Sequence, residues 1–167
     1  IFGNIFARLP NTAVEVANIK SLIAANKQKH IFTRYEATED NFKQKAPSAK
    51  YLHIATHGIL SEENPTFSGL ILTTDPKSKE DGFCYLVEIY NMKINSELVV
   101  LSACQTGLGK LIAGEGLEGL TRAFMYAGAK RLIVSLWSVD DASTADFMTS
   151  FYNSHLKANE TPAKALC

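Results

Sequence analysis

The stretch Leu98–Gly109 reads LVVLSACQTGLG, an uninterrupted aliphatic run followed by a cysteine. The first four residues show no polar alternation, which is typical of a parallel strand covered on both faces. After Ser102 the sequence becomes polar and rich in glycine, so we expect the strand to end there. Cys104 therefore follows the carboxyl end of a buried strand, and the question is what a thiol does at that position.

Strand and helix patterns alternate along the rest of the chain. This alternation predicts an α/β domain with a mainly parallel central sheet between two helical layers, a three-layer α-β-α sandwich. Two apolar runs around the polar loop DPKSKED predict a hairpin outside the main sheet. We expect Thr38 to cap the second helix and Gly128 to end the fourth. The expected strands are His30–Tyr35, Tyr51–Thr56, Glu97–Ser102 and Arg131–Trp137, and the expected helices are residues 11–27, 38–46, 86–93, 116–128 and 140–157.

The composition is that of an ordinary globular domain. Of the 167 residues, 46% are hydrophobic and 20% charged, and 17 basic residues balance 17 acidic ones. This balance lacks the basic surface of a nucleic-acid-binding domain, and no apolar run reaches the roughly 18 residues of a membrane span. The 3 cysteines lie far apart without CxxC spacing, and their odd number argues against a disulfide framework and favours a reducing, cytoplasmic compartment. Because the chain starts at Ile1 and stops within a helix start, we expect residues 1–167 to be one domain of a longer chain.

Reactive residues follow three of the expected strands. His57, Cys104 and the pair Asp140-Asp141 each come after one strand end. Because the carboxyl ends of parallel strands meet at one edge of a sheet, we expect these residues to converge. An imidazole accepts the proton of a neighbouring thiol near neutral pH, so His57 is the candidate base for Cys104. The backbone N–H groups of Gly58 and Cys104 are candidates for an oxyanion hole.

The sequence alone leaves other interpretations of these residues open. A lone cysteine is more often a small core residue than a nucleophile, and Cys84 in the hairpin is interpreted in this way. His53 and His57 lie four residues apart, which would suit a metal pair on a helix. In a strand, however, four residues at about 3.3 Å each separate the two side chains by about 13 Å. We therefore predict no catalytic metal and no cofactor.

The segments HIATHG and LSACQTG resemble the CHAT domain, a caspase-like peptidase module often fused to tetratricopeptide repeats. The likeness covers most of residues 11–166 and includes NPTFSGLIL, GEGLEGLTRAFMYAGAKRLIVSLWSVDD and FYNSHL. It departs from the caspase signature Q-A-C-[RQG]-G, because Ser102 replaces the first glutamine and a threonine precedes the glycine. Neither departure affects the cysteine or the histidine.

This resemblance implies a caspase–separase type fold and a cysteine endopeptidase that cleaves a protein or peptide substrate. His57 would act on Cys104 as a catalytic dyad with a backbone oxyanion hole. A tetratricopeptide-repeat region in the same or a partner chain would regulate the domain. The expected partners do not include nucleic acid or a membrane.

The loops after the strand ends carry mostly acidic residues, which would attract a basic substrate side chain. Separase-like peptidases place an acid after the tryptophan-containing strand to hold arginine, and Asp141 in LWSVDD is the better match. Asp140 and Glu115 complete the candidate substrate-binding residues. We therefore predict cleavage after Arg or Lys. The alternative is that Asp140 or Asp141 only caps the helix that starts there.

Two further functions stay open. The segment Gly114–Gly119 reads GEGLEG and matches the GxGxxG motif of dinucleotide-binding domains. About ten residues separate Ser102 from Gly114, however, whereas the first glycine of that motif directly follows its strand. The other alternative is a caspase-like domain that lacks catalysis and acts as a scaffold for protein interactions.

Overall fold

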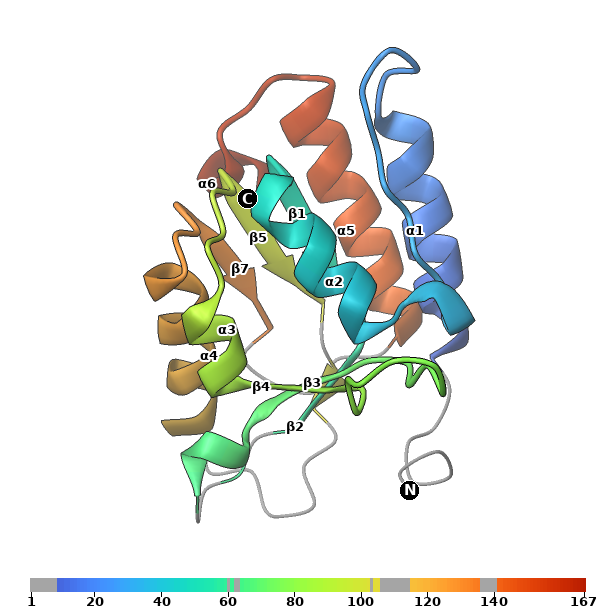
Figure 1. The fold of residues 1–167 in the computed structure, drawn as a ribbon. Coiled ribbons are helices and arrows are strands. Elements are labelled where there is room, and N and C mark those ends of the chain that lie inside the picture. Colours follow the sequence, from blue (N-terminus) through green and yellow to red (C-terminus); the bar gives the residue numbers. More distant parts are fainter. Residues whose placement is uncertain (1–8, 60, 62–63, 103, 106–114, 136–140) are drawn as a thin grey trace. The chain divides into compact units, whose positions relative to one another are not determined.

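The computed structural model describes residues 9–59, 61, 64–102, 104–105, 115–135 and 141–167 (Figure 1). The chain divides into two compact units. The terminal unit comprises residues 1–31 and 139–167, and the central unit comprises residues 32–138.

A parallel three-stranded sheet runs through the central unit. Its strands are β1 (Tyr51–Ile54), β5 (Leu98–Leu101) and β7 (Leu132–Val134), in the order β1-β5-β7. All four residues of β5 are at most 1% exposed. Because successive residues of a strand point to opposite faces, both faces of β5 are covered. The predicted parallel sheet and α/β class are confirmed, and the arrangement is consistent with a caspase-like fold.

A second sheet contains four short strands in the order β4-β3-β2-β6. They are β2 (His57–Ile59), β3 (Gly69–Ile71), β4 (Phe83–Tyr85) and β6 (Cys104–Gln105). β3 pairs antiparallel with both β2 and β4, whereas β2 and β6 are parallel. The predicted hairpin is therefore confirmed as β3 and β4, outside the main sheet.

The helices of the central unit begin and end close to the predicted residues. They are α2 (Glu39–Lys45), α3 (Leu86–Asn91) and α4 (Glu115–Tyr126), with short 3-10 turns η1 (Arg34–Glu36), η2 (Ala46–Ser48) and η3 (Pro65–Phe67). The hydroxyl of Thr38 accepts the N–H of Asn41 at 3.2 Å, which confirms the predicted cap of α2. Phe124 of α4 and Ile89 of α3 share one buried cluster with Val99 of β5, so both helices bury apolar residues with the main sheet.

The terminal unit consists of helices. α1 (Pro10–Leu22) and α5 (Asp141–Leu156) lie side by side (Figure 1), and α6 (Pro162–Ala165) follows α5. Ile19 of α1 and Phe151 of α5 are buried, and the amide of Asn18 donates to the hydroxyl of Thr149 at 3.3 Å. Among the described residues, no helix combines the length and apolar character that crossing a membrane requires.

Two predictions near the N-terminus are wrong. The first helix begins at Pro10 and ends at Leu22, whereas the predicted helix continues to Lys27. The backbone angle φ of proline suits the first residue of a helix, and the N–H that proline lacks would have no partner within the helix at that position. This explains why the helix starts at Pro10 and not at the predicted residue 11. The segment 30–35 is no strand, because it pairs with none of the described strands and Arg34 has φ +53°. Strand propensity alone does not form a strand without a neighbour.

Candidate active site

The two residues expected to react lie on neighbouring strands of the second sheet. β2 begins at His57 and β6 begins at Cys104. The strands are parallel, and their register puts His57 opposite Cys104 and Gly58 opposite Gln105. Neighbouring strands are about 4.8 Å apart, and positions in register occupy the same face of a sheet. The fold therefore brings together two positions that are far apart in the sequence.

Both positions are set by the main sheet. Ile54 and Leu101 are register partners at the ends of β1 and β5. His57 follows Ile54 by three residues and Cys104 follows Leu101 by three residues, so the register is carried into the second sheet. This confirms the prediction that His57 and Cys104 follow the ends of parallel strands. It corrects the expectation that they sit in loops, because both belong to short strands.

The backbone around His57 is firmly held. His57 is 9% exposed, and Gly58 beside it is buried. The hydroxyl of Thr56 donates a hydrogen bond to the carbonyl of Ile71 at the end of β3. The strand that carries the imidazole thus has a fixed position against β3. The side chain of Cys104 lies outside the part of the chain that the structure describes.

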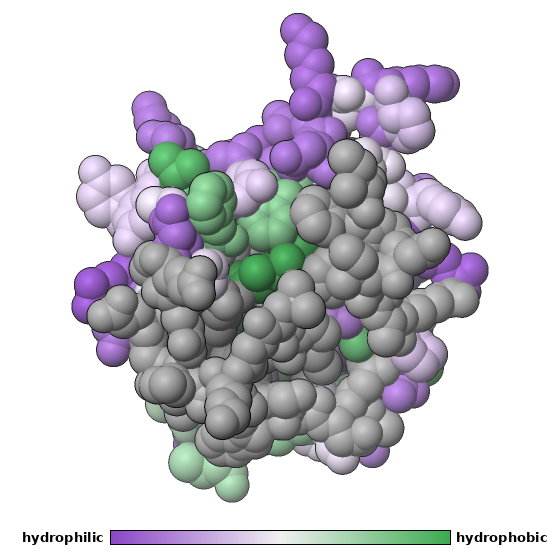
Figure 2. All heavy atoms as spheres, turned by 90° about the horizontal axis from the view of Figure 1, so that it is seen from below, coloured by the Kyte–Doolittle hydropathy of each residue, from purple (hydrophilic) through white to green (hydrophobic). Residues whose placement is uncertain are grey.

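The end of the molecule at which β2, β3 and β4 lie has a mixed surface. Both hydrophobic and hydrophilic side chains of described residues are visible from this end (Figure 2). Close to the second sheet, Phe67 and Val87 are 58% and 55% exposed. The ring of Phe67 meets that of Tyr85 edge-on, with centroids 6.3 Å apart. Exposed apolar groups therefore border the sheet that carries His57.

The predicted substrate-binding acids belong to different units. Asp141 is the first residue of α5 in the terminal unit, and Asp140 lies outside the described residues. Glu115 is the first residue of α4 in the central unit. Glu118 is exposed and pairs with Arg122 at 3.0 Å. Glu118, one of the acidic residues expected in the loops after the strand ends, therefore lies within α4 instead.

The glycine motif is not a turn between a strand and a helix. Gly116 and Gly119 lie inside α4, and Gly114 lies outside the described residues. A Cβ atom at Gly119 would lie 2.9 Å from Cδ1 of Leu86, so the glycine allows α4 to pack closely against α3. A dinucleotide-binding motif needs its glycines in the turn that follows the strand. Helix packing accounts for Gly119 instead.

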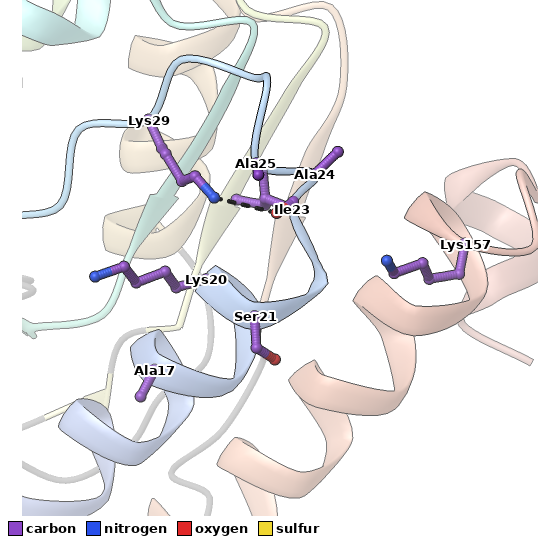
Figure 3. A pocket seen from close by; sticks show the side chains of 8 residues that line it. All are labelled: Ala17, Lys20, Ser21, Ile23, Ala24, Ala25, Lys29 and Lys157. Carbon is purple, nitrogen blue, oxygen red and sulfur yellow. Dashed lines mark hydrogen bonds between the residues drawn. The ribbon is translucent and has the colours of Figure 1, made fainter.

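A surface hollow of about 560 Å³ in the terminal unit is lined by lysine and small side chains (Figure 3). The ammonium of Lys29 donates to the carbonyl of Ile23, just after α1, at 3.1 Å. Lys20 lies in the last turn of α1, and Lys157 follows α5 directly. Cations at these places offset the partial negative charge of helix C-termini. Helix termination therefore accounts for these lysines.

One group of possible metal ligands occurs among the described residues. Single ligand atoms of Glu39, Cys84 and Glu88 lie within 4.8 Å of one another. The ammonium of Lys43 is 2.8 Å from Glu39 and 2.6 Å from Glu88. A cation of the protein itself therefore already neutralises these carboxylates.

Comparison with protein families identifies the chain. A model described as the CHAT domain matches residues 3–167. The chain belongs to the CHAT domain family. This confirms the resemblance seen in HIATHG and LSACQTG and connects the domain with a family related to caspase-like peptidases.

Two curated relatives of this CHAT domain are the tetratricopeptide repeat protein 28 of Mus musculus and that of Homo sapiens. They are 38% and 37% identical to it over 76 residues, which is 46% of this chain. The chain spans only about 3% of the length of either relative. The names of both relatives agree with the expected association between a CHAT domain and tetratricopeptide repeats.

Proposed function

We propose that this CHAT domain is a cysteine endopeptidase in which His57 and Cys104 form the catalytic dyad. The observation that carries the proposal is the register of β2 and β6, which puts these two positions opposite each other. An imidazole next to a thiol is the arrangement that generates a thiolate nucleophile near neutral pH. The relationship of the family to caspase-like peptidases supports the same reaction class.

In the proposed reaction, the imidazole of His57 takes the thiol proton and the thiolate of Cys104 attacks the carbonyl carbon of a peptide bond. The C–S bond forms while the carbonyl π electrons move to oxygen. Collapse of this intermediate breaks the C–N bond, and His57 gives its proton to the leaving amine. A water molecule that has lost a proton to His57 then attacks the thioester. This releases the carboxylic acid and restores the thiol.

The proposed oxyanion hole uses the backbone N–H groups of Gly58 and Cys104. Gly58 carries no side chain, so a substrate carbonyl can approach its backbone. Two donors aimed at the developing oxyanion stabilise the tetrahedral intermediate more than the planar substrate. Gly58 is in register with Leu70 on one side and with Gln105 on the other, so it lies inside the described sheet. Cys104 starts the edge strand of the described sheet and is the less constrained donor.

We propose that the substrate is cleaved after Arg or Lys. Asp141 is the candidate carboxylate for the basic side chain, with Asp140 and Glu115 as additional acids. A carboxylate that accepts two parallel hydrogen bonds from a guanidinium gives strong selectivity for arginine. The same carboxylate would hold a lysine less specifically, through a single charged group.

We also propose the setting in which this domain acts. Tetratricopeptide repeats in the same or a partner chain would control access to the dyad, as the names of the two relatives suggest. The compartment would be the reducing cytoplasm, where a catalytic thiol remains free.

The proposal is tested by covalent labelling with an arginyl ketone that carries a leaving group on its methyl carbon. We expect modification of Cys104, identified by mass spectrometry of the digested protein. His57→Ala should slow this labelling by at least about a hundredfold, because the thiolate is no longer formed by an adjacent base. His53→Ala is the matched control, since His53 lies on β1 and is assigned no catalytic role. Equal labelling of the wild type and the His57 variant would contradict the dyad.

A further inference from the structure

Lys43 lies at the centre of three carboxylates in the central unit. Its Nζ atom is 2.8 Å from Oε1 of Glu39 on the same helix, α2. It is also 2.7 Å from Oε2 of Glu80, before β4, and 2.6 Å from Oε1 of Glu88 on α3. The side chain of Glu39 is only 1% exposed, whereas those of Lys43, Glu80 and Glu88 are 26%, 34% and 29% exposed, so water screens the Lys43–Glu39 pair least. One ammonium therefore joins three separate segments.

Two of these carboxylates also hold the backbone of β4. Oε2 of Glu39 accepts the N–H of Gly82, immediately before the strand, at 3.0 Å. Oε2 of Glu88 accepts the N–H of Tyr85, the last residue of the strand, at 2.8 Å. Each carboxylate thus uses one oxygen for Lys43 and the other for the backbone. Both ends of β4 are tied to a single ammonium.

β4 is connected to the strand of His57 through two pairings. Cys84 of β4 is in register with Leu70 of β3, and Leu70 is in register with Gly58 of β2. β3 and β4 are so close that a Cβ atom at Gly69 would lie 2.3 Å from the carbonyl oxygen of Cys84. Tightly packed strands shift together because no space between them absorbs a displacement. A change in the position of β4 therefore reaches β2.

The carboxylates depend on the cation. Burial raises the pKa of Glu39, because a charged carboxylate is costly away from water. Burial lowers the pKa of Lys43, but hydrogen bonds to the three carboxylates outweigh this effect and leave the pKa above its usual value. Without the ammonium, the carboxylates of Glu39 and Glu88 would remain beside the buried thiol of Cys84 with no cation between them. The hydrogen bonds to both ends of β4 would then weaken.

We infer that Lys43 is a positioning residue for His57. Its ammonium holds β4 at the edge of the second sheet and, through β3, keeps β2 in register with β6. The effect on catalysis rests on the proposed function, whereas the effect on the strands does not.

The test compares Lys43→Met, which removes the charge and keeps the length, with Lys43→Arg, which keeps the charge. Lys50→Met is the matched control, because Lys50 is 64% exposed and pairs with Glu97 at the surface at 3.5 Å. In Lys43→Met we expect amide hydrogen exchange of residues 57–59 and 82–85 to accelerate at least about tenfold, with α4 unchanged. Lys43→Arg and Lys50→Met should stay within about threefold of the wild type.

The catalytic part of the inference is measured by the rate of Cys104 labelling with the arginyl ketone and by peptide hydrolysis. Lys43→Met should lower the labelling rate constant at least about tenfold. It should also lower kcat and leave KM nearly unchanged, because the base is displaced while the substrate contacts remain. The pH profile of labelling should change in this variant and return in Lys43→Arg. A merely structural lysine would not change the profile of the folded protein.

The possible results separate the two proposals. Faster exchange in β4 with unchanged exchange in β2 overturns the positioning role. Suppose instead that exchange is faster in both strands of Lys43→Met, but the wild type is never labelled at Cys104. This result overturns the peptidase function and leaves the structural link between Lys43 and β2 intact. If Lys43→Met does not fold, Glu88→Gln replaces it, since an amide oxygen still accepts the N–H of Tyr85 but interacts more weakly with Lys43. Unchanged exchange at residues 57–59 in Glu88→Gln then overturns the positioning role.

Discussion

The thiol of Cys84 has no exposed surface, whereas Cys167 is exposed. Burial also raises the pKa of the Cys84 thiol, and the carboxylates of Glu88 and Glu39 raise it further. Because the thiolate is the reacting form, both access and ionisation oppose modification of Cys84 in the folded protein. These observations support the interpretation of Cys84 as a core residue.

We predict that iodoacetamide at pH 8 modifies Cys84 at least about a hundredfold more slowly than Cys167, because Cys84 reacts only when the sheet opens. Mass spectrometry of peptides taken at successive times gives the two rates. In urea the difference should disappear, which serves as the control. Equal rates in the native protein would mean that β3 and β4 separate readily in solution.

The residues of the candidate site were predictable to different extents. His57 and Cys104 each follow an apolar run, so local sequence alone pointed to them as residues after strand ends. Lys43 gave no such signal, since two of its partners, Glu80 and Glu88, are distant in sequence and come near it only in the folded chain. From sequence alone, a lysine near the end of a short helix is predicted to be an ordinary solvent-exposed residue. Tertiary contacts decide its role.

Among the helices, α4 ends in a way that its sequence predicts. Gly128 has φ +112°, and its N–H donates to the carbonyl of Met125 at 3.1 Å. The N–H of Ala129 donates to the carbonyl of Phe124 at 3.0 Å, which completes a Schellman motif. A Cβ atom at Gly128 would lie 2.0 Å from the carbonyl oxygen of Ile94. Both the backbone angle and the available space therefore require glycine.

Gly128→Ala should destabilise the protein by at least about 2 kcal/mol, because left-handed backbone costs an L-residue about 1–2 kcal/mol and the steric overlap adds to it. Urea unfolding followed by circular dichroism measures the change in the free energy of unfolding. Lys130→Ala, at an exposed neighbouring position, should change this free energy by less than about 0.5 kcal/mol. A neutral Gly128 variant would show that the end of α4 rearranges.

Short elements were harder to predict than long ones. The aliphatic run of β5 and the capped start of α2 carry clear signals within one segment. β2 and β6 have three and two residues, one of them a glycine, so they show no period. β2 forms by pairing with β3 and β6, and β6 forms by pairing with β2. The segment 30–35 is the opposite case. Its composition is typical of a strand, but it pairs with no described strand and therefore does not form one.

At the scale of the whole molecule, the proposed catalytic dyad and the main candidate for specificity, Asp141, belong to different units. His57 and Cys104 belong to the central unit, and Asp141 begins α5 of the terminal unit. Chemistry and selectivity are therefore expected to respond separately to mutation. A change at Asp141 would affect the choice of substrate and leave the reactivity of the thiol intact.

We predict that Asp141→Asn lowers kcat/KM for an arginyl peptide about 100-fold, since losing a charged, two-point contact costs about 3 kcal/mol in transition-state binding. Asp141 is the first residue of α5, where the loss of a negative charge costs at most about 1 kcal/mol of stability, so the larger loss of kcat/KM reports on substrate binding. Asp146→Asn, at an exposed position of the same helix, is the matched control.

The measurement uses peptides that differ only in the residue before the cleaved bond, together with iodoacetamide labelling of Cys104 as a readout independent of substrate. If Asp141 holds the guanidinium, the variant loses its preference for Arg while the labelling rate stays within about threefold of the wild type. Preference of the wild type for Asp or for no residue would rule out an acidic specificity site. An equal loss in Asp146→Asn would point instead to the general negative field around α5, which added salt would screen.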